Sequence, residues 1–274
     1  MSDITKLRRR WLWGNNPKGP FFIVGNGRSG TSVMLATVRK TLNLKYYGEG
    51  HLYPLLGDLS RATEKYFNSA RIKNLSKSDA HMIHHVKHSD VDERLAKMVR
   101  NIFFDVYGTT EFVDKTPGPM PILSLPMLEA AFPTMKIIHM KRRGIEVVRS
   151  ALKKFNETDF ETHCVIWEQA LANWEKIEPR LKVPHITIDQ HTLATEPETS
   201  VKQLEDFLEL TSEQAQTMLG FFQNDRPQSS GSLNKGGVSL ESSGWSEEEI
   251  EIYRRVGAKM MARHGWSEDE SYFA

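Results

Sequence analysis

The sequence predicts an α/β fold with a central sheet whose strands are mainly parallel. Short apolar runs rich in β-forming residues alternate with longer segments whose apolar residues recur at helical spacing. No internal repeat and no low-complexity segment interrupts this alternation. Alternating strands and helices are typical of parallel sheets that are covered by helices. The length of 274 residues fits one large domain, so we expect a single domain over residues 1–274.

Four short segments have the composition of strands. The first, Phe21–Val24, is wholly apolar and follows two nearby prolines. A short apolar run of this kind is typical of a strand that is buried on both faces. The other three candidates are Glu111–Val113, Lys136–Met140 and His185–Ile188.

Helices are expected between and after these strands, because apolar residues recur there at intervals of three or four. The first of them carries Val33, Leu35, Val38 and Leu42. The expected helices cover Ser29–Leu42, Ile145–Phe155, Glu161–Ile177, Glu198–Leu208, Ser212–Phe222 and Glu247–Arg263.

Two segments depart from the simple alternation. Residues 61–107 are polar, helical in pattern and too long for a simple crossover, so we interpret them as a helical insertion that forms part of a cap over the site. Residues 225–244 are rich in Ser, Gly and Asn, which predicts a mobile C-terminal loop. Mobile loops of this kind often act as lids.

Composition limits the classes of function. The net charge is +1, which argues against a nucleic-acid partner and requires any anion site to be local. Cys164 is the only cysteine, so the chain has no internal disulfide and no cysteine-cluster metal site. No apolar run reaches the roughly 18 residues of a membrane span, and none near the N-terminus suits a signal peptide. We therefore expect a cytoplasmic protein without a membrane span, and the sequence leaves open whether it forms a homo-oligomer.

The most informative stretch is the glycine-rich loop Gly25–Ser32, which follows a predicted strand and opens a predicted helix. In this context, glycines let the backbone approach a ligand, and the free N–H groups of the helix start point at an anion. On the P-loop pattern, Gly25 and Gly30 take the glycine positions and Thr31 stands where the lysine is expected. The missing lysine argues against nucleotide hydrolysis. Arg28, inside the loop, supplies a positive charge instead.

A second basic motif follows the predicted strand Lys136–Met140. Arg142 stands at the strand end, and Ser150 follows it by eight residues in the next predicted helix. An arginine offers a fork of donors to a phosphate, and a serine hydroxyl adds another. The neighbouring cations Lys141 and Arg143 leave open which residue is the main ligand.

These two motifs resemble those of the sulfotransferases, which transfer a sulfuryl group from 3′-phosphoadenosine 5′-phosphosulfate (PAPS) to an acceptor. The resemblance implies a three-layer, P-loop-like α/β fold with a central, mainly parallel sheet. It also implies that Arg142 and Ser150 bind the 3′-phosphate of PAPS, and that the loop with Lys235 binds the donor as well. The residues implied to hold the 5′ end of the donor are Arg28, Ser29, Gly30, Thr31 and Ser32.

Sulfuryl transfer needs a base for the acceptor hydroxyl and cations for the developing charge, but no metal. Glu49 lies in a segment that resembles the base loop of some sulfotransferases; it is the first candidate for the base, and His51 is the second. Lys115 resembles the lysine of the family's Lys-Thr-Pro turn and would stabilise the leaving phosphate or the sulfonate, together with Arg28. Alternatively, Glu49 caps the following helix and Lys115 is a surface charge in a turn.

Two other functions remain open. Asp114 follows two apolar residues as a Walker B aspartate does, which keeps a nucleotide kinase with Mg²⁺ as an alternative. The third candidate is a non-catalytic nucleotide-binding protein, in which Glu49 and Lys115 would be dispensable. For the sulfotransferase, we expect the acceptor to be a hydroxyl of a small molecule, a lipid or a sugar.

Several histidines occur at intervals of three and four residues. On a helix this spacing places them on one face, where a pair could hold a divalent metal. No motif such as His-Glu-x-x-His is present, and we expect no metal site. The stripe comprises His81, His84, His85 and His88, and Asp92 continues it by a further turn.

Overall fold

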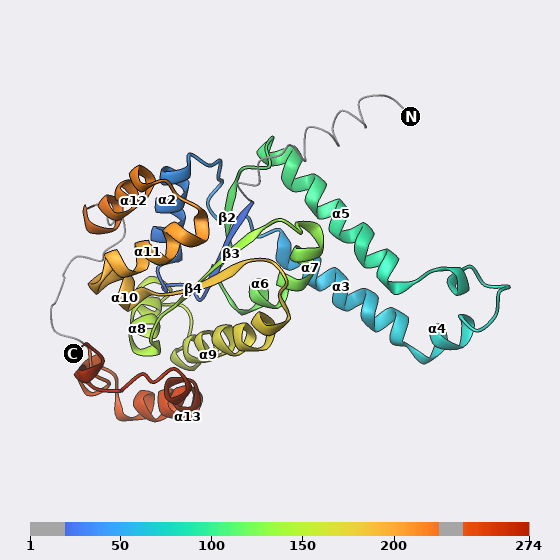
Figure 1. Cartoon of the computed structure of the whole chain (residues 1–274). Coiled ribbons are helices and arrows are strands. Elements are labelled where there is room, and N and C mark those ends of the chain that lie inside the picture. The colour runs from blue at the N-terminus through green and yellow to red at the C-terminus, as the bar shows by residue number, and fades with distance from the viewer. Residues whose placement is uncertain (1–19, 225–237, 274) are drawn as a thin grey trace.

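The computed structural model describes residues 20–224 and 238–273, and within them a four-stranded parallel sheet lies at the centre (Figure 1). The strand order is β2-β1-β3-β4, and each neighbouring pair is parallel. This arrangement confirms the predicted α/β class and the parallel sheet. The strands are β1 (Phe21–Gly25), β2 (Val113–Lys115), β3 (Lys136–Lys141) and β4 (His185–Asp189).

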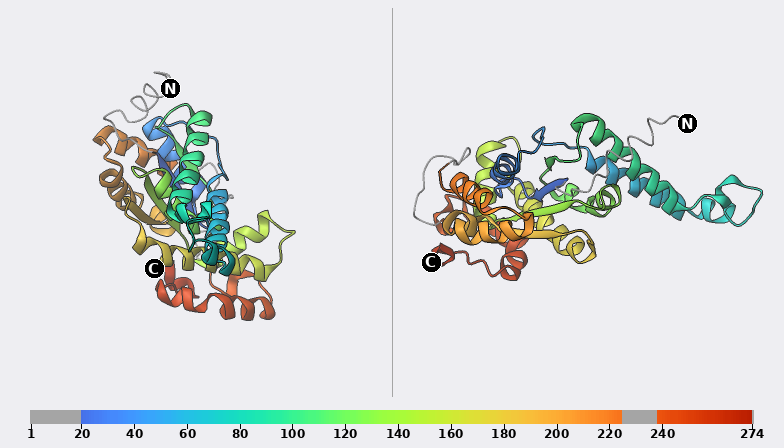
Figure 2. Two further views of the ribbon diagram at one scale, coloured as in Figure 1. Left: turned by 90° about the vertical axis from the view of Figure 1, so that its right-hand side faces the viewer. Right: turned by 45° about the horizontal axis from the view of Figure 1, so that its top comes forward.

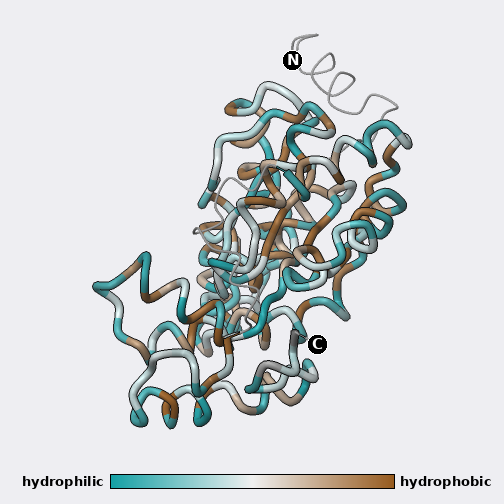
Figure 3. Tube along the Cα trace, turned by 90° about the vertical axis from the view of Figure 1, so that its left-hand side faces the viewer, coloured by the Kyte–Doolittle hydropathy of each residue, from teal (hydrophilic) through white to brown (hydrophobic). Residues whose placement is uncertain are grey.

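Both faces of the sheet are buried, as the apolar strand sequences predict. Successive side chains of a strand point to opposite faces. Phe22 and Val24 accordingly pack into one core cluster, and Phe21 and Ile23 into another. Figure 3 shows hydrophobic stretches of the chain at the centre of the molecule.

Helices form a layer on each face of the sheet. The Phe21 side is covered by α2 (Thr31–Leu42), α10 (Gln190–Thr195), α11 (Pro197–Leu208) and α12 (Ser212–Asn224). The Phe22 side is covered by α3 (Tyr53–Asn68), α5 (His88–Tyr107), α6 (Pro119–Leu123), α7 (Leu125–Ala131) and α9 (Phe160–Ile177). The result is the three-layer architecture that the sequence analysis expected.

A third core cluster joins the C-terminal part to the body. It lies between α8 (Gly144–Lys154), α9 and α13 (Glu247–Arg263). Trp167 is fully buried in this cluster. Short 3₁₀ turns complete the chain at Glu178–Arg180, Glu241–Ser243 and Glu270–Phe273. No helix within the described ranges is long and apolar enough to cross a bilayer.

A helical hairpin stands between α2 and β2. It consists of α3, α4 (Ala70–Leu75), the 3₁₀ turn Met82–His85 and α5, and it projects away from the sheet (Figures 1 and 2). Its helices begin at Tyr53, whereas the sequence analysis placed the insertion from residue 61. Pro54 stands in the first turn of α3, where the missing N–H of a proline costs no helical hydrogen bond.

Two expectations about short elements were wrong. The second strand occupies Val113–Lys115, two residues later than expected, because its register is set by pairing with β1 and not by its own composition. The histidine stripe does not lie on one helix: a 3₁₀ turn holds His84 and His85, extended residues follow, and His88 opens α5. The described residues contain no group of His, Cys, Asp and Glu that could hold a metal ion.

The aromatic packing around Phe22 gives a test of the core. Its ring is fully buried and contacts Tyr53, Phe103, Phe112 and Phe132. We expect Phe22→Ala to lower the free energy of unfolding by about 3–5 kcal/mol in urea titrations, because it leaves a cavity between β1 and the helices.

The matched control is Phe155→Ala, because the ring of Phe155 is exposed. It should cost less than about 1 kcal/mol. Equal costs for the two variants would contradict the packing described above.

Candidate functional site

The glycine-rich loop after β1 is a tight turn that only glycine at its first position allows. Gly25 has a φ of 138°, and a Cβ there would lie 2.3 Å from the carbonyl oxygen of Met140 on β3. Gly30, with a φ of 87°, is the N-cap of α2 and provides no side-chain acceptor for the first N–H groups of the helix. The start of α2 is therefore suited to an anion, as the loop sequence predicted.

The structure brings the two predicted anion-binding motifs into contact. Nε of Arg28 donates a hydrogen bond to Oγ of Ser150 at 2.9 Å. Nη1 of Arg142 donates to the carbonyl oxygen of Arg28, also at 2.9 Å. Residues more than 110 positions apart thus form one cationic cluster at the carboxyl ends of β1 and β3.

Arg142 carries an unused donor inside this cluster. Its Nε is buried and has no hydrogen-bond partner among the described residues. Burial also lowers the pKa of its guanidinium. A buried guanidinium N–H without a partner costs free energy, so the cluster fits an anionic ligand that would accept this hydrogen bond.

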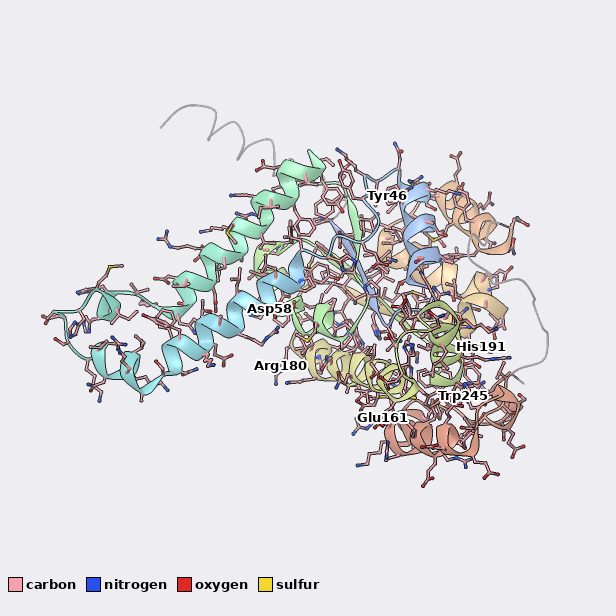
Figure 4. The ribbon with its side chains drawn as sticks, turned by 180° about the vertical axis from the view of Figure 1, so that it is seen from behind. Tyr46, Asp58, Glu161, Arg180, His191 and Trp245 are labelled. Carbon is pink, nitrogen blue, oxygen red and sulfur yellow. The ribbon has the colours of Figure 1, made fainter. Side chains whose placement is uncertain are left out.

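The cations on either side of Arg142 have other partners in the protein. Arg143 is fully buried; it pairs with Glu146 and donates to the carbonyl oxygens of Ser267 and Asp269. It therefore ties the C-terminal segment to α8. Figure 4 shows Trp245 and His191 on the same side of the molecule.

Lys141 lies 3.7 Å from a carboxylate oxygen of Asp189 at the end of β4. Of the three consecutive cations, Arg142 is the one that contacts the loop. The last predicted ligand, Lys235, lies outside the described residues, as do residues 225–237 of the expected mobile loop.

A chain of polar contacts runs from the loop to the candidate base. Nζ of Lys115 donates to Oγ of Ser32 at 2.9 Å and to Oε1 of Glu49 at 2.6 Å. Oε2 of Glu49 lies 3.0 Å from Nε2 of His51. Lys115 is buried in β2, so the alternative interpretation of it as a surface charge in a turn was wrong. The two candidates for the base, Glu49 and His51, therefore contact each other through the carboxylate of Glu49.

The Glu49 side chain is 38% exposed, which leaves its carboxylate accessible. Burial alone would raise the pKa of Glu49, but the hydrogen bond and the charge of Lys115, with a contribution from His51, lower it below its ordinary value. The carboxylate is therefore ionised at neutral pH. Helix α3 begins at Tyr53 with Leu52 as its N-cap and has no side-chain cap, so the interpretation of Glu49 as a helix cap was wrong. In Figure 4, the segment that carries Glu49 runs between Tyr46 and Asp58.

A buried network that sequence reasoning missed holds this segment in place. The backbone N–H of His51 donates to Oγ1 of Thr116 at 3.1 Å, and Asp114 accepts hydrogen bonds from Thr116 and from the hydroxyl of Tyr107. A Cβ on Gly50 would lie 2.0 Å from Oδ2 of Asp114, so the segment packs directly on this carboxylate. No local signal marks the contacts of His51 with Thr116 and of Gly50 with Asp114, because these partners are more than 60 residues apart in the sequence.

Asp114 and Lys115 point to opposite faces of the sheet. The carboxylate of Asp114 faces Tyr107 on the α5 side, whereas the ammonium group of Lys115 faces Ser32 on the α2 side. A Walker B aspartate and the loop serine hold one Mg²⁺ together. Here the loop serine instead contacts a lysine, an arrangement that does not suit a Mg²⁺-nucleotide kinase.

Comparisons with known proteins were made for the whole chain. A family model described as "Sulfotransferase family" matches residues 20–214, which include both predicted anion-binding motifs and Glu49. No curated protein matches the chain.

Among solved structures, the sulfotransferase domain from the curacin biosynthetic pathway is 18% identical with a TM-score of 0.50; the match covers 91% of this chain and 98% of that one. The sulfotransferase STF9 from Mycobacterium avium is 12% identical with a TM-score of 0.53, and the match covers 97% of this chain and 82% of that one. At these identities, the two structures support the fold alone.

The buried carboxylate of Asp114 predicts a dependence of stability on pH. Burial raises its pKa to about 6, so between pH 4 and 6 the folded state binds the proton more tightly than the unfolded state. The contribution of this group to the free energy of unfolding therefore falls as the pH rises through that window. Asp114→Asn removes the titration. We expect its free energy of unfolding, relative to the unsubstituted protein, to rise by about 2 kcal/mol from pH 4 to pH 7 in urea titrations. A difference that does not change with pH would contradict the raised pKa.

Proposed function

The chain belongs to the sulfotransferase family, and from this premise we propose that it transfers a sulfuryl group from PAPS to a hydroxyl of a small-molecule, lipid or sugar acceptor. The single observation that carries the proposal is the 2.9 Å hydrogen bond between Arg28 and Ser150. PAPS has an anionic group at each end of its ribose. A site for it needs two anion-binding motifs on one surface, and this contact joins two such motifs.

Within this proposal, the loop after β1 holds the 5′-phosphosulfate. The N–H groups at the start of α2 and the hydroxyls of Ser29, Thr31 and Ser32 provide donors, Gly30 allows close approach, and Arg28 provides positive charge. Arg142 and Ser150 hold the 3′-phosphate, to which the buried Nε of Arg142 donates. Lys235 is assigned to the donor by resemblance alone.

The chemistry is an in-line displacement at sulfur. The acceptor oxygen forms a bond to sulfur as the bond between sulfur and the 5′-phosphate oxygen breaks, and the acceptor proton passes to a base. We assign the base to Glu49, whose carboxylate is ionised and accessible. His51, 3.0 Å away, is the alternative base or the residue that orients Glu49. The products are the sulfated acceptor and adenosine 3′,5′-bisphosphate.

Lys115 connects the two halves of the reaction. Its ammonium group contacts Ser32 in the donor loop and Glu49 at the acceptor side. Negative charge develops on the 5′-phosphate oxygen as the sulfuryl group leaves, and a cation held in a buried position stabilises such charge without reorganising. Lys115 and Arg28 therefore act on the leaving group, while Lys115 also keeps Glu49 ionised.

The first prediction of this proposal concerns the donor. We expect Arg142→Met to weaken the binding of adenosine 3′,5′-bisphosphate by about 10- to 100-fold in calorimetry, because a charge-assisted contact to the 3′-phosphate is lost. Binding of adenosine 5′-monophosphate, which lacks that phosphate, should change less than about two-fold. Arg255→Met, at an exposed position of α13, is the matched control. An equal loss of affinity for both nucleotides would show that Arg142 stabilises the loop and does not bind the 3′-phosphate.

The second prediction concerns the base. We expect Glu49→Gln to lower the turnover of PAPS with a hydroxyl acceptor by about 10²- to 10⁴-fold, with unchanged affinity for adenosine 3′,5′-bisphosphate. Lys115→Ala should also lower turnover steeply while the fold is retained. Glu111→Gln, at an exposed position before β2, is the control.

Near-normal turnover in both Glu49→Gln and Lys115→Ala would support a non-catalytic nucleotide-binding protein instead. A larger loss in His51→Gln than in Glu49→Gln would move the role of base to His51.

A further inference from the structure

Positive charge is concentrated at the tip of the helical hairpin, which we define as residues 65–88. This segment holds five Lys and Arg residues and one acidic residue, Asp79, in a chain whose net charge is +1. All five cationic side chains belong to exposed residues: Lys65, Arg71, Lys73, Lys77 and Lys87. The hairpin tip is therefore far more basic than the chain as a whole.

The same tip exposes large apolar side chains. Met82 is 83% exposed, more than any other large apolar residue that the structure describes, and Tyr66 is 54% exposed. Large apolar side chains gain free energy when they move from water into an apolar environment, and in the isolated protein these side chains stay in water. Apolar side chains flanked by cations are typical of a segment that lies in the interface of a membrane.

The tip is an ordered structure. Nδ1 of His84 lies 2.8 Å from the carbonyl oxygen of Ser76, and Nε2 of His85 lies 3.3 Å from that of Asp79, so both rings brace the chain between α4 and α5. Ser69 caps α4 through its side chain. The folded structure of the hairpin therefore holds Met82 in its exposed position.

At the base of the tip, α3 and α5 are joined by polar and aromatic contacts. The hydroxyl of Thr63 donates to a carboxylate oxygen of Asp92 at 2.9 Å, and the ring of Phe67 stacks on His88 with centroids 5.0 Å apart. These contacts fix the two long helices to each other where the tip begins.

The hairpin holds the tip away from the rest of the protein (Figures 1 and 2). Helix α3 has 16 residues and α5 has 20, which correspond to lengths of about 24 and 30 Å. A protruding tip with cationic flanks and an exposed methionine fits a flat anionic surface into which an apolar side chain can insert. A nucleic acid would give the cations partners but would offer no apolar phase to Met82.

We propose that the hairpin tip docks on the surface of an anionic lipid bilayer. The lysines and Arg71 lie near the headgroups, where each cation gains from the negative surface potential, and Met82 enters the boundary of the acyl region. This docking is independent of the proposed sulfuryl transfer, because Glu49 and Arg142 lie in the body, beyond the opposite end of the hairpin.

Vesicle sedimentation tests the proposal. The full chain should sediment with vesicles of phosphatidylcholine mixed with phosphatidylserine, should stay in solution with phosphatidylcholine alone, and should be released by high salt. The double variant Lys73→Glu with Lys77→Glu should bind at least about 25-fold more weakly, because each cation near an anionic surface contributes roughly a five-fold factor. Met82→Gln should weaken binding by about five-fold.

The matched control is the double variant Lys176→Glu with Lys259→Glu, which changes the net charge equally at exposed positions of α9 and α13. Its binding should stay within about two-fold of the unsubstituted protein. An equal loss in the two double variants, or equal binding to both vesicle types, would overturn the proposal. Tighter binding to single-stranded RNA or to an acidic polypeptide than to the anionic vesicles would overturn the assignment to lipid. Thermal unfolding and the affinity for adenosine 3′,5′-bisphosphate are measured on the same variants. Both should be unchanged, so a loss of vesicle binding is distinguished from a loss of the fold or of the proposed donor site.

Discussion

The close approach of the loop after β1 to the end of β3 is the constraint on which the site depends. Gly25 has room for no side chain against Met140, and this contact seats the loop where Arg28 reaches Ser150 and its carbonyl oxygen meets Arg142. The carboxyl ends of adjacent parallel strands share one edge, where ligands of open α/β sheets bind. The fold therefore brings the two predicted anion-binding motifs together by placing β1 beside β3.

The two-residue period of β2 divides its polar side chains between two tasks. Asp114 points to the α5 side and, through Thr116, holds the segment that carries His51 and Gly50. Lys115 points to the α2 side, where it meets Ser32. Burial acts on both: it raises the pKa of Asp114 and keeps Lys115 away from competing solvent. One short strand thus places a carboxylate beside the segment of the proposed base and an ammonium group beside the loop of the proposed donor site.

The consecutive arginines after β3 show how position within a turn sets a role. Arg142 contacts the loop, and its buried Nε has no hydrogen-bond partner among the described residues, whereas Arg143 is the N-cap residue of α8 and is fully buried. There it meets Glu146 and the carbonyl oxygens of the C-terminal segment. A buried guanidinium requires such partners, because an unpaired charge in the interior is costly. The C-terminal segment is thereby attached beside the proposed donor site.

The sequence by itself determined the parallel α/β class, and it predicted an anion-binding loop and a second basic motif at Arg142 and Ser150, because each of these depends on residues close together in the chain. It also indicated Glu49, through the resemblance of its loop. Only the tertiary structure decided that β2 lies at Val113–Lys115, that Lys115 is buried against Glu49, and that the histidines do not share a helix. These features depend on strand register and on contacts between distant segments. Composition and periodicity describe neighbours along the chain, and they carry no information on which distant side chains a fold brings together.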